Sequence, residues 1–106
     1  MKLLTKKIEE RFKKIGSQEN DKDPIVIAKF FNPVGAGYWY ATEYDPVDKI
    51  FYGYVSLSGD HCDEWGSFSL EELESIIGFG GLGIERDLHC GEKRISEFNI
   101  KSLKNN

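Results

Sequence analysis

The sequence contains few of the residues that define secreted, membrane and metal-binding proteins. Its 106 residues include only two cysteines, two histidines and three prolines. No stretch approaches the roughly 20 apolar residues that a membrane-spanning helix needs, and the apolar run within residues 1–7 is too short for a signal peptide. We therefore expect a cytoplasmic protein that does not bind membranes and whose cysteines are reduced thiols.

Common catalytic and nucleotide-binding motifs are also missing from the sequence. There is no G-K-[ST] of a P-loop, no Ser-His-Asp signature and no EF-hand loop. Residues 78–83 match G-x-G-x-x-G, but these glycines follow a predicted helix and precede a predicted strand. A dinucleotide site needs the opposite order, because phosphate binds the amide groups of a helix N-terminus. We expect residues 78–83 to form a helix C-cap and a tight loop. For the whole protein we expect no cofactor and no catalytic residues.

The overall composition is that of one globular domain covering residues 1–106. Apolar residues make up 40% of the chain and charged residues 30%, which is typical of a folded protein. Aromatic residues reach 13% and are concentrated between Phe30 and Phe68.

Charge is distributed unevenly along the chain. Residues 1–16 carry a net charge of +4, residues 17–92 carry −11 and residues 93–106 carry +3. A nucleic-acid-binding protein normally concentrates positive charge on its binding surface, and here only the two ends could supply it. The acidic middle would instead attract a basic partner surface.

Two helices are predicted from apolar periodicity and capping residues. The first covers residues 5–15, with Thr5 as N-cap and Gly16 as C-cap. Its apolar stripe comprises Leu4, Ile8, Phe12 and Ile15. The second follows Ser69, which has capping-box spacing to Glu72.

Runs of β-branched and aromatic residues predict strands at residues 25–31, 38–44, 50–57, 65–68 and 83–89. The first three follow one another through short, turn-rich connections, so an antiparallel meander is expected. A short closing helix is expected in the tail after Cys90. The predicted fold class is α+β, with a small antiparallel sheet of four to five strands, an N-terminal helix and a second short helix.

Alternation along the second and third strands predicts a tyrosine-rich sheet face. Its members are Tyr38, Tyr40, Tyr44, Tyr52 and Tyr54. Tyrosine is enriched at interface hot spots, so this face is a candidate contact surface. The alternative is that helices cover it or that the tyrosines pack within a half-exposed sheet. Base stacking on single-stranded RNA also uses aromatic residues on strands, but the acidic middle argues against it.

The same alternation predicts a buried ion pair. It places Glu43 on the face of Trp39, and it places Arg86 with Ile84 and Leu88. A buried charge is tolerated only with a partner. We therefore predict that Glu43 and Arg86 form an ion pair that specifies the fold rather than performs catalysis.

Two His-Cys pairs, His61-Cys62 and His89-Cys90, are weak metal candidates. Two histidines and two cysteines could hold tetrahedral zinc, but adjacent residues rarely reach the same ion. Usual ligand pairs are separated by about two to four residues. A cysteine nucleophile would also lack a recognisable third group to orient its histidine.

Six segments together form a recognisable combination over nearly the whole chain. They are Met1–Thr5, Lys29–Pro33, Trp39–Asp45, Phe51–Val55, Gly66–Leu73 and Gly83–His89. This combination resembles the bacterial domain-of-unknown-function family 2958. Members of that family occur largely on plasmids, phages and integrative elements, so the resemblance implies a mobile-element protein. It implies no catalytic site, and the His-Cys pairs are not part of the family pattern.

The first functional hypothesis is a non-enzymatic binding protein, such as an anti-CRISPR inhibitor of host defence. Its acidic middle would bind the basic surface of a nucleic-acid-binding host protein, and the tyrosine face would add contact area. The predicted surface combines those five tyrosines with Glu71, Glu72 and Glu74.

Two alternatives belong to other functional classes. One is a small enzyme or metal protein that uses Glu43, Arg86, Asp87 and the two His-Cys pairs. The other is direct nucleic-acid binding through the basic ends, which the acidic middle disfavours.

Overall fold

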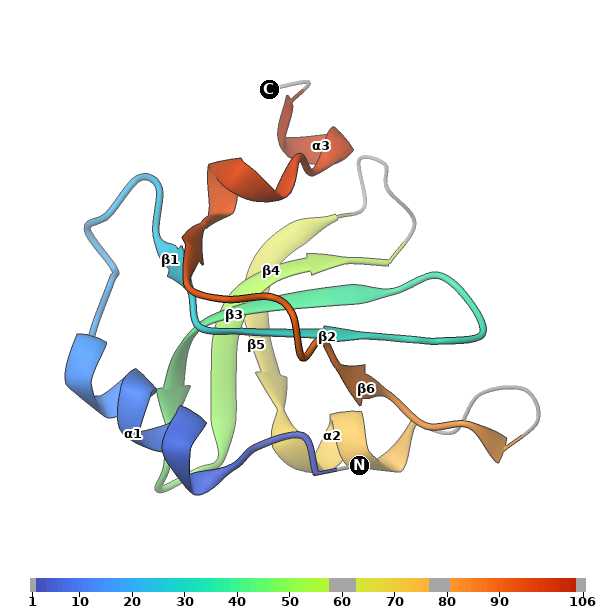
Figure 1. The fold of residues 1–106 in the computed structure, drawn as a ribbon. Coiled ribbons are helices and arrows are strands. Elements are labelled where there is room, and N and C mark those ends of the chain that lie inside the picture. Colours follow the sequence, from blue (N-terminus) through green and yellow to red (C-terminus); the bar gives the residue numbers. More distant parts are fainter. Residues whose placement is uncertain (1, 58–62, 77–80, 105–106) are drawn as a thin grey trace.

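The computed structural model describes residues 2–57, 63–76 and 81–104, and it confirms the α+β class (Figure 1). Its elements are α1 (Lys6–Ile15), β1 (Ile25–Val26), β2 (Ala28–Phe31), β3 (Tyr38–Asp45), β4 (Ile50–Ser56), β5 (Glu64–Ser69), α2 (Leu70–Ser75), β6 (Glu85–Arg86), β7 (Lys93–Arg94), the 3-10 helix η2 (Ile95–Phe98) and α3 (Lys101–Lys104). The main sheet has the strand order β5-β4-β3-β2-β6, and β1 pairs separately with β7. Within the described ranges, no helix has the length and apolar character needed to cross a bilayer.

Both predicted helix starts are confirmed by their capping hydrogen bonds. The Thr5 hydroxyl oxygen accepts from the backbone N–H of Ile8 at 3.2 Å, and the Ser69 hydroxyl accepts from that of Glu72 at 2.9 Å. Gly16 ends α1 with a φ of 71°, and its N–H donates to the carbonyl oxygen of Phe12. Only glycine adopts this positive-φ conformation without steric cost, which explains why the helix ends there.

Two predicted strands are shorter or divided in the structure. The run at 25–31 splits into β1 and β2, because its first part pairs with β7 and its second part with β3 and β6. The run at 83–89 keeps only Glu85–Arg86 as a strand. The carboxylate of Asp87 accepts from the backbone N–H of His89 at 2.8 Å, which makes a local turn and ends the strand.

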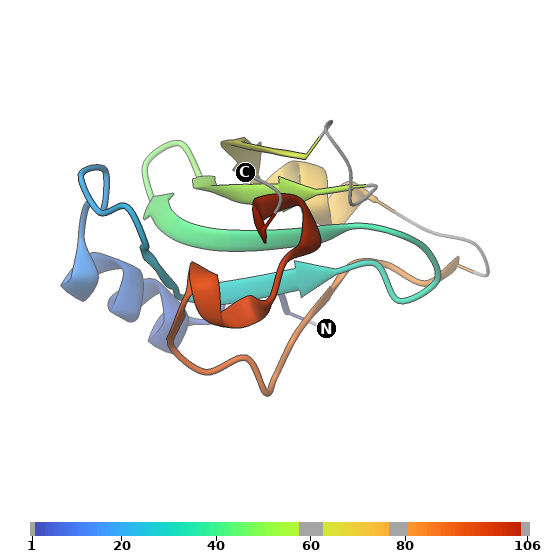
Figure 2. The same ribbon diagram turned by 90° about the horizontal axis from the view of Figure 1, so that it is seen from above.

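The main sheet is covered on both faces (Figures 1 and 2). Helices α1 and α2 lie on one face, which we call the α1 face. Its core comprises Leu3, Leu4, Ile8, Phe12, Ile27, Ala28, Phe30, Trp39, Ala41, Phe51, Phe68, Leu73 and Ile84. The C-terminal segment 90–104 lies across the other face of the sheet, which we call the C-terminal face. Its smaller core comprises Val26, Tyr40, Tyr54, Cys90, Ile95 and Ile100.

A β-bulge interrupts the alternation of β3. Ala41 lies opposite Gly53 but Glu43 lies opposite Tyr52, so Thr42 is an extra residue in β3. The Thr42 side chain is buried, and its hydroxyl donates to the carbonyl oxygen of Tyr52 at 3.2 Å. An extra residue reverses which side chains reach each face of the sheet beyond it. The part of β3 after Thr42 therefore has the opposite phase to the part before it.

Close approach of β3 and β4 requires glycine at position 53. A Cβ atom there would collide with the backbone carbonyl of Tyr40, whereas a Cβ at the directly opposed Gly66 meets no atom within 4 Å. We predict that Gly53→Ala lowers the free energy of unfolding by about 2–3 kcal/mol, because backbone must shift to admit the methyl group. The matched variant Gly66→Ala should change it by less than about 0.5 kcal/mol in urea denaturation. Equal effects of the two variants would contradict this account of the β3–β4 contact.

Candidate cation-binding pocket

The predicted face of five tyrosines forms only in part. The strand register puts Tyr38, Tyr40, Tyr52 and Tyr54 on the C-terminal face. Tyr44 follows the bulge and lies on the α1 face, where its ring centroid is 5.8 Å from that of Phe12 and 4.7 Å from that of Phe51. The prediction is therefore wrong for Tyr44, because strict alternation does not hold across Thr42.

The C-terminal segment covers two of the four remaining tyrosines. The Tyr40 ring contacts Phe98 edge-on at 5.4 Å, and the Tyr54 hydroxyl hydrogen-bonds the Ser102 hydroxyl at 2.7 Å. Both tyrosines are buried, whereas Tyr38 and Tyr52 keep 43% and 42% of their surface exposed. Tyr40 and Tyr54 are therefore core residues, in agreement with the alternative that helices cover the tyrosine face. They cannot contact a partner unless the C-terminal segment is displaced.

The acidic residues of α2 are exposed but lie away from the exposed tyrosines. Glu71, Glu72 and Glu74 all face solvent, while Leu73 of the same helix is buried in the core of the α1 face. Tyr38 and Tyr52 lie on the opposite face of the sheet. The predicted combination of tyrosines and α2 glutamates is therefore not one continuous surface.

The predicted ion pair between Glu43 and Arg86 is wrong. Arg86 lies opposite Phe30 in the register and so belongs to the α1 face, whereas the bulge turns Glu43 to the C-terminal face beside Tyr52. The Arg86 guanidinium donates to the backbone carbonyl oxygens of Lys2 and Leu3, the latter at 3.2 Å. Arg86 thus fastens the N-terminal segment to the sheet.

The His-Cys pairs do not form a described metal site. His61 and Cys62 lie outside the described residues. Among the residues that are described, no group of three or more His, Cys, Asp or Glu side chains could hold a metal ion. His89 is exposed in a turn, while Cys90 is buried in the core of the C-terminal face. Burial raises the pKa of the Cys90 thiol, so little reactive thiolate forms near neutral pH.

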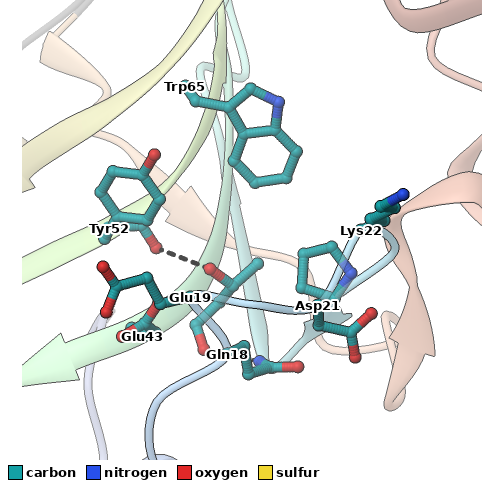
Figure 3. Close-up of a pocket in the computed structure, with 9 residues that line it drawn as sticks. Gln18, Glu19, Asp21, Lys22, Glu43, Tyr52 and Trp65 are labelled. Atoms are coloured by element: carbon teal, nitrogen blue, oxygen red, sulfur yellow. Dashed lines mark hydrogen bonds between the residues drawn. The ribbon is translucent and has the colours of Figure 1, made fainter.

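One concavity lined by both charged and aromatic side chains is a pocket beside the bulge (Figure 3). It has a volume of about 570 Å³. We call it the acidic–aromatic pocket, and its lining comprises Gln18, Glu19, Asp21, Lys22, Pro24, Thr42, Glu43, Tyr52 and Trp65. The rings of Tyr52 and Trp65 lie nearly parallel, with centroids 6.3 Å apart and an interplanar angle of 18°. Their strands β4 and β5 form the aromatic side, while the loop 17–24 forms the opposite wall.

Gln18 holds this loop against the sheet. Its amide nitrogen donates to the carbonyl oxygens of Ile25 and Thr42, both at 2.8 Å, and its amide oxygen accepts from the Ile25 N–H at 2.7 Å. The Gln18 side chain is almost fully buried. One side chain therefore joins the loop, β1 and the bulge, which fixes the shape of the pocket.

The same loop is tied to the C-terminal segment through two carboxylates. Arg94 forms an ion pair with Asp21 at 3.1 Å, and Ser96 donates from both its N–H and its hydroxyl to Asp23. A hydrogen bond from the Asp23 N–H, followed by the Arg94 contact, lowers the pKa of the Asp21 carboxyl. Asp21 is therefore charged at neutral pH and compensated by Arg94.

Two pocket carboxylates, Glu19 and Glu43, are not compensated in this way. Within the described part of the chain, neither forms an ion pair, and Lys22 is the one cation among the lining residues. Carboxylates beside the faces of aromatic rings favour a bound organic cation, because both attract positive charge. Of the pocket residues, the sequence analysis named Glu43 and Tyr52, but for other roles, and it missed Gln18 and Trp65. Trp65 could have been found by pairing the predicted strands β4 and β5, because it then lies opposite Tyr54 on the tyrosine-rich face.

The chain matches a known protein family. The family model described as "Protein of unknown function (DUF2958)" matches residues 3–104. The protein belongs to the DUF2958 family. The resemblance noted from the sequence motifs is therefore confirmed over nearly the whole chain. No curated protein and no solved structure matches the sequence.

For this DUF2958 protein we predict that Gln18→Ala lowers the free energy of unfolding by about 1–3 kcal/mol. The substitution leaves the Ile25 N–H and the Ile25 and Thr42 carbonyl oxygens without their partner. Urea denaturation measures the loss. Glu19→Ala is the matched control, since that neighbouring side chain is exposed and should change stability by less than about 0.5 kcal/mol. If Gln18→Ala leaves the free energy of unfolding unchanged, this side chain does not hold the loop.

A second prediction concerns alkaline pH. Burial, followed by the nearby Tyr38 hydroxyl, raises the pKa of Tyr40 from 10.0 to about 12. The unfolded state therefore loses this proton first, and the folded state is progressively destabilised between about pH 10 and pH 12, by about 2 kcal/mol in total. Tyr40→Phe should remove this contribution, which is seen by comparing the unfolding free energies of the two proteins across that range. If the free energy of unfolding falls with pH equally in wild type and variant, Tyr40 is not a buried, neutral side chain with a raised pKa.

Proposed function

We propose that this DUF2958 protein is a non-enzymatic binding protein of a mobile genetic element. In this proposal its acidic surface engages the basic, nucleic-acid-binding surface of a host protein, as an anti-CRISPR inhibitor of host defence would. The observation that carries the proposal is the acidic–aromatic pocket, which Glu19 and Glu43 line together with the rings of Tyr52 and Trp65. Such a lining suits a cationic protein side chain.

The charge of the wider surface supports the same partner class. Residues 17–92 carry a net charge of −11, and α2 presents Glu71, Glu72 and Glu74 to solvent without a basic residue in its last turn. A surface of this sign accelerates encounter with a basic partner and repels phosphate. Helix α2 packs on the face of the sheet opposite the pocket. We therefore propose that its glutamates attract the basic partner at long range but do not contact it in the complex.

The enzyme alternative has less support, because its residues lie in separate places. Arg86 bonds the N-terminal backbone, and Asp87 forms an ion pair with Lys29 at 3.7 Å. Glu43 lies on the other face from Arg86, and Cys90 is a buried thiol. Catalysis by these groups would need them within hydrogen-bond reach of one substrate.

Affinity capture from host lysate at two salt concentrations tests the proposal. We predict that a nucleic-acid-binding protein is captured at about 50 mM NaCl and lost at about 500 mM, because salt screens exposed charges. Replacing Glu19 and Glu43 together by Gln should weaken this binding about 5- to 30-fold. The matched triple variant Glu71→Gln, Glu72→Gln and Glu74→Gln should weaken it by less than about 3-fold. Binding that is unchanged by salt, or weakened only by the α2 variant, would contradict the proposal.

A further inference from the structure

The neighbourhood of the acidic–aromatic pocket indicates which partner segment it accepts. We infer that the pocket takes one arginine side chain of an extended partner segment, while an apolar side chain of the same segment enters an adjoining hollow. This inference rests on the proposed function, because it identifies the part of the basic partner that is recognised. Four features of the described residues carry it.

The first feature is the aromatic side of the pocket. Trp65 is partly exposed and Tyr52 keeps 42% of its surface exposed, so both rings are available for contact. Their planes differ by only 18°, so the neighbouring strands β4 and β5 present two aromatic faces of nearly the same orientation. A planar guanidinium stacks on such a surface and still donates sideways from its edge, which an ammonium group cannot do.

The second feature is the carboxylate next to this surface. Glu43 lies directly opposite Tyr52 in the β3–β4 register, and directly opposed side chains in a sheet are neighbours on one face. Glu43 thus lies at the edge of the aromatic surface, where it can accept from the fork of a guanidinium stacked on it. Glu19 lines the pocket from the loop and provides a second acceptor.

The third feature is the adjoining hollow, which has a volume of about 420 Å³. It shares Trp65 and Lys22 with the pocket, and its other lining residues are Asp23, Ile95, Ser96, Ile100 and Leu103. Three of these are aliphatic side chains of the C-terminal segment. In an extended segment, residues i and i+2 point to the same side, so arginine and an apolar residue with this spacing would enter the two sites.

The fourth feature is Lys22, which lines both cavities and carries the opposite charge to Glu43. Its ammonium group opposes a cationic ligand in the pocket. Removing this charge should therefore strengthen binding, whereas removing the Glu43 charge should weaken it. Opposite signs from two substitutions in the lining of one pocket are not expected from a general loss of structure.

The test uses the blocked peptide Gly-Arg-Ser-Leu-Gly and the full chain, with NMR chemical shifts of the Trp65 indole N–H as readout. We expect saturable shifts, and about 10-fold weaker binding when citrulline, the uncharged analogue, replaces arginine. Lysine in place of arginine, or serine in place of leucine, should each weaken binding about 3-fold or more. Glu43→Gln should weaken and Lys22→Gln should strengthen binding of the arginine peptide, while the distant Glu71→Gln should leave it unchanged.

Several outcomes would overturn the inference. For the ligands, these outcomes are equal affinity for the arginine and citrulline peptides, and equal or tighter binding of the lysine peptide or of free spermidine. For the protein, they are the absence of a shift at Trp65 and effects of the same sign for Glu43→Gln and Lys22→Gln. Failure of the peptide together with salt-sensitive capture of a partner rejects the recognition of arginine by the pocket but not the proposed function. Peptide binding without any salt-sensitive partner supports the pocket and contradicts the proposed function.

Discussion

The extra residue at Thr42 is the constraint on which the two faces of the sheet depend. Before it, Trp39 and Ala41 reach the α1 face; after it, Tyr44 does so, and Glu43 turns to the other side. The bulge is stable because the Thr42 hydroxyl bonds the carbonyl of Tyr52 and its own carbonyl accepts from Gln18. A buried bulge without these partners would leave polar groups unsatisfied, which costs stability. The acidic–aromatic pocket is therefore a consequence of how this irregularity is accommodated.

The C-terminal segment has a structural role that also defines the candidate site. Phe98 and Ser102 cover Tyr40 and Tyr54, which removes them from the surface. Arg94 and Ser96 bind the carboxylates of the loop 17–24 and so position the wall of the pocket. What would otherwise be a broad aromatic face becomes one pocket and one apolar hollow that share Trp65. A limited opening of this kind favours recognition of individual side chains over a large flat interface.

Much of the fold could be predicted from sequence because its determinants are local. Thr5, Gly16 and Ser69 cap helices through contacts with residues only a few positions away. The strands of the meander follow from β-branched and aromatic runs separated by turn residues. The divided strand at 25–31 could not be predicted in this way, because β7, which pairs with its first part, is about 70 residues later in the chain. The family, too, follows from motifs distributed along the chain.

Sequence by itself determined the α+β class, the helix caps, the acidic middle and the presence of aromatic residues on adjacent strands. The tertiary structure alone decided which of those residues meet. Strict alternation paired Glu43 with Arg86 and grouped five tyrosines, but one bulge reversed the phase of β3 and separated them. The physical reason is that side-chain direction in a strand has a period of two, so a single extra residue exchanges the two faces. Whether a strand contains that residue depends on pairing with its neighbours, which no local sequence pattern encodes.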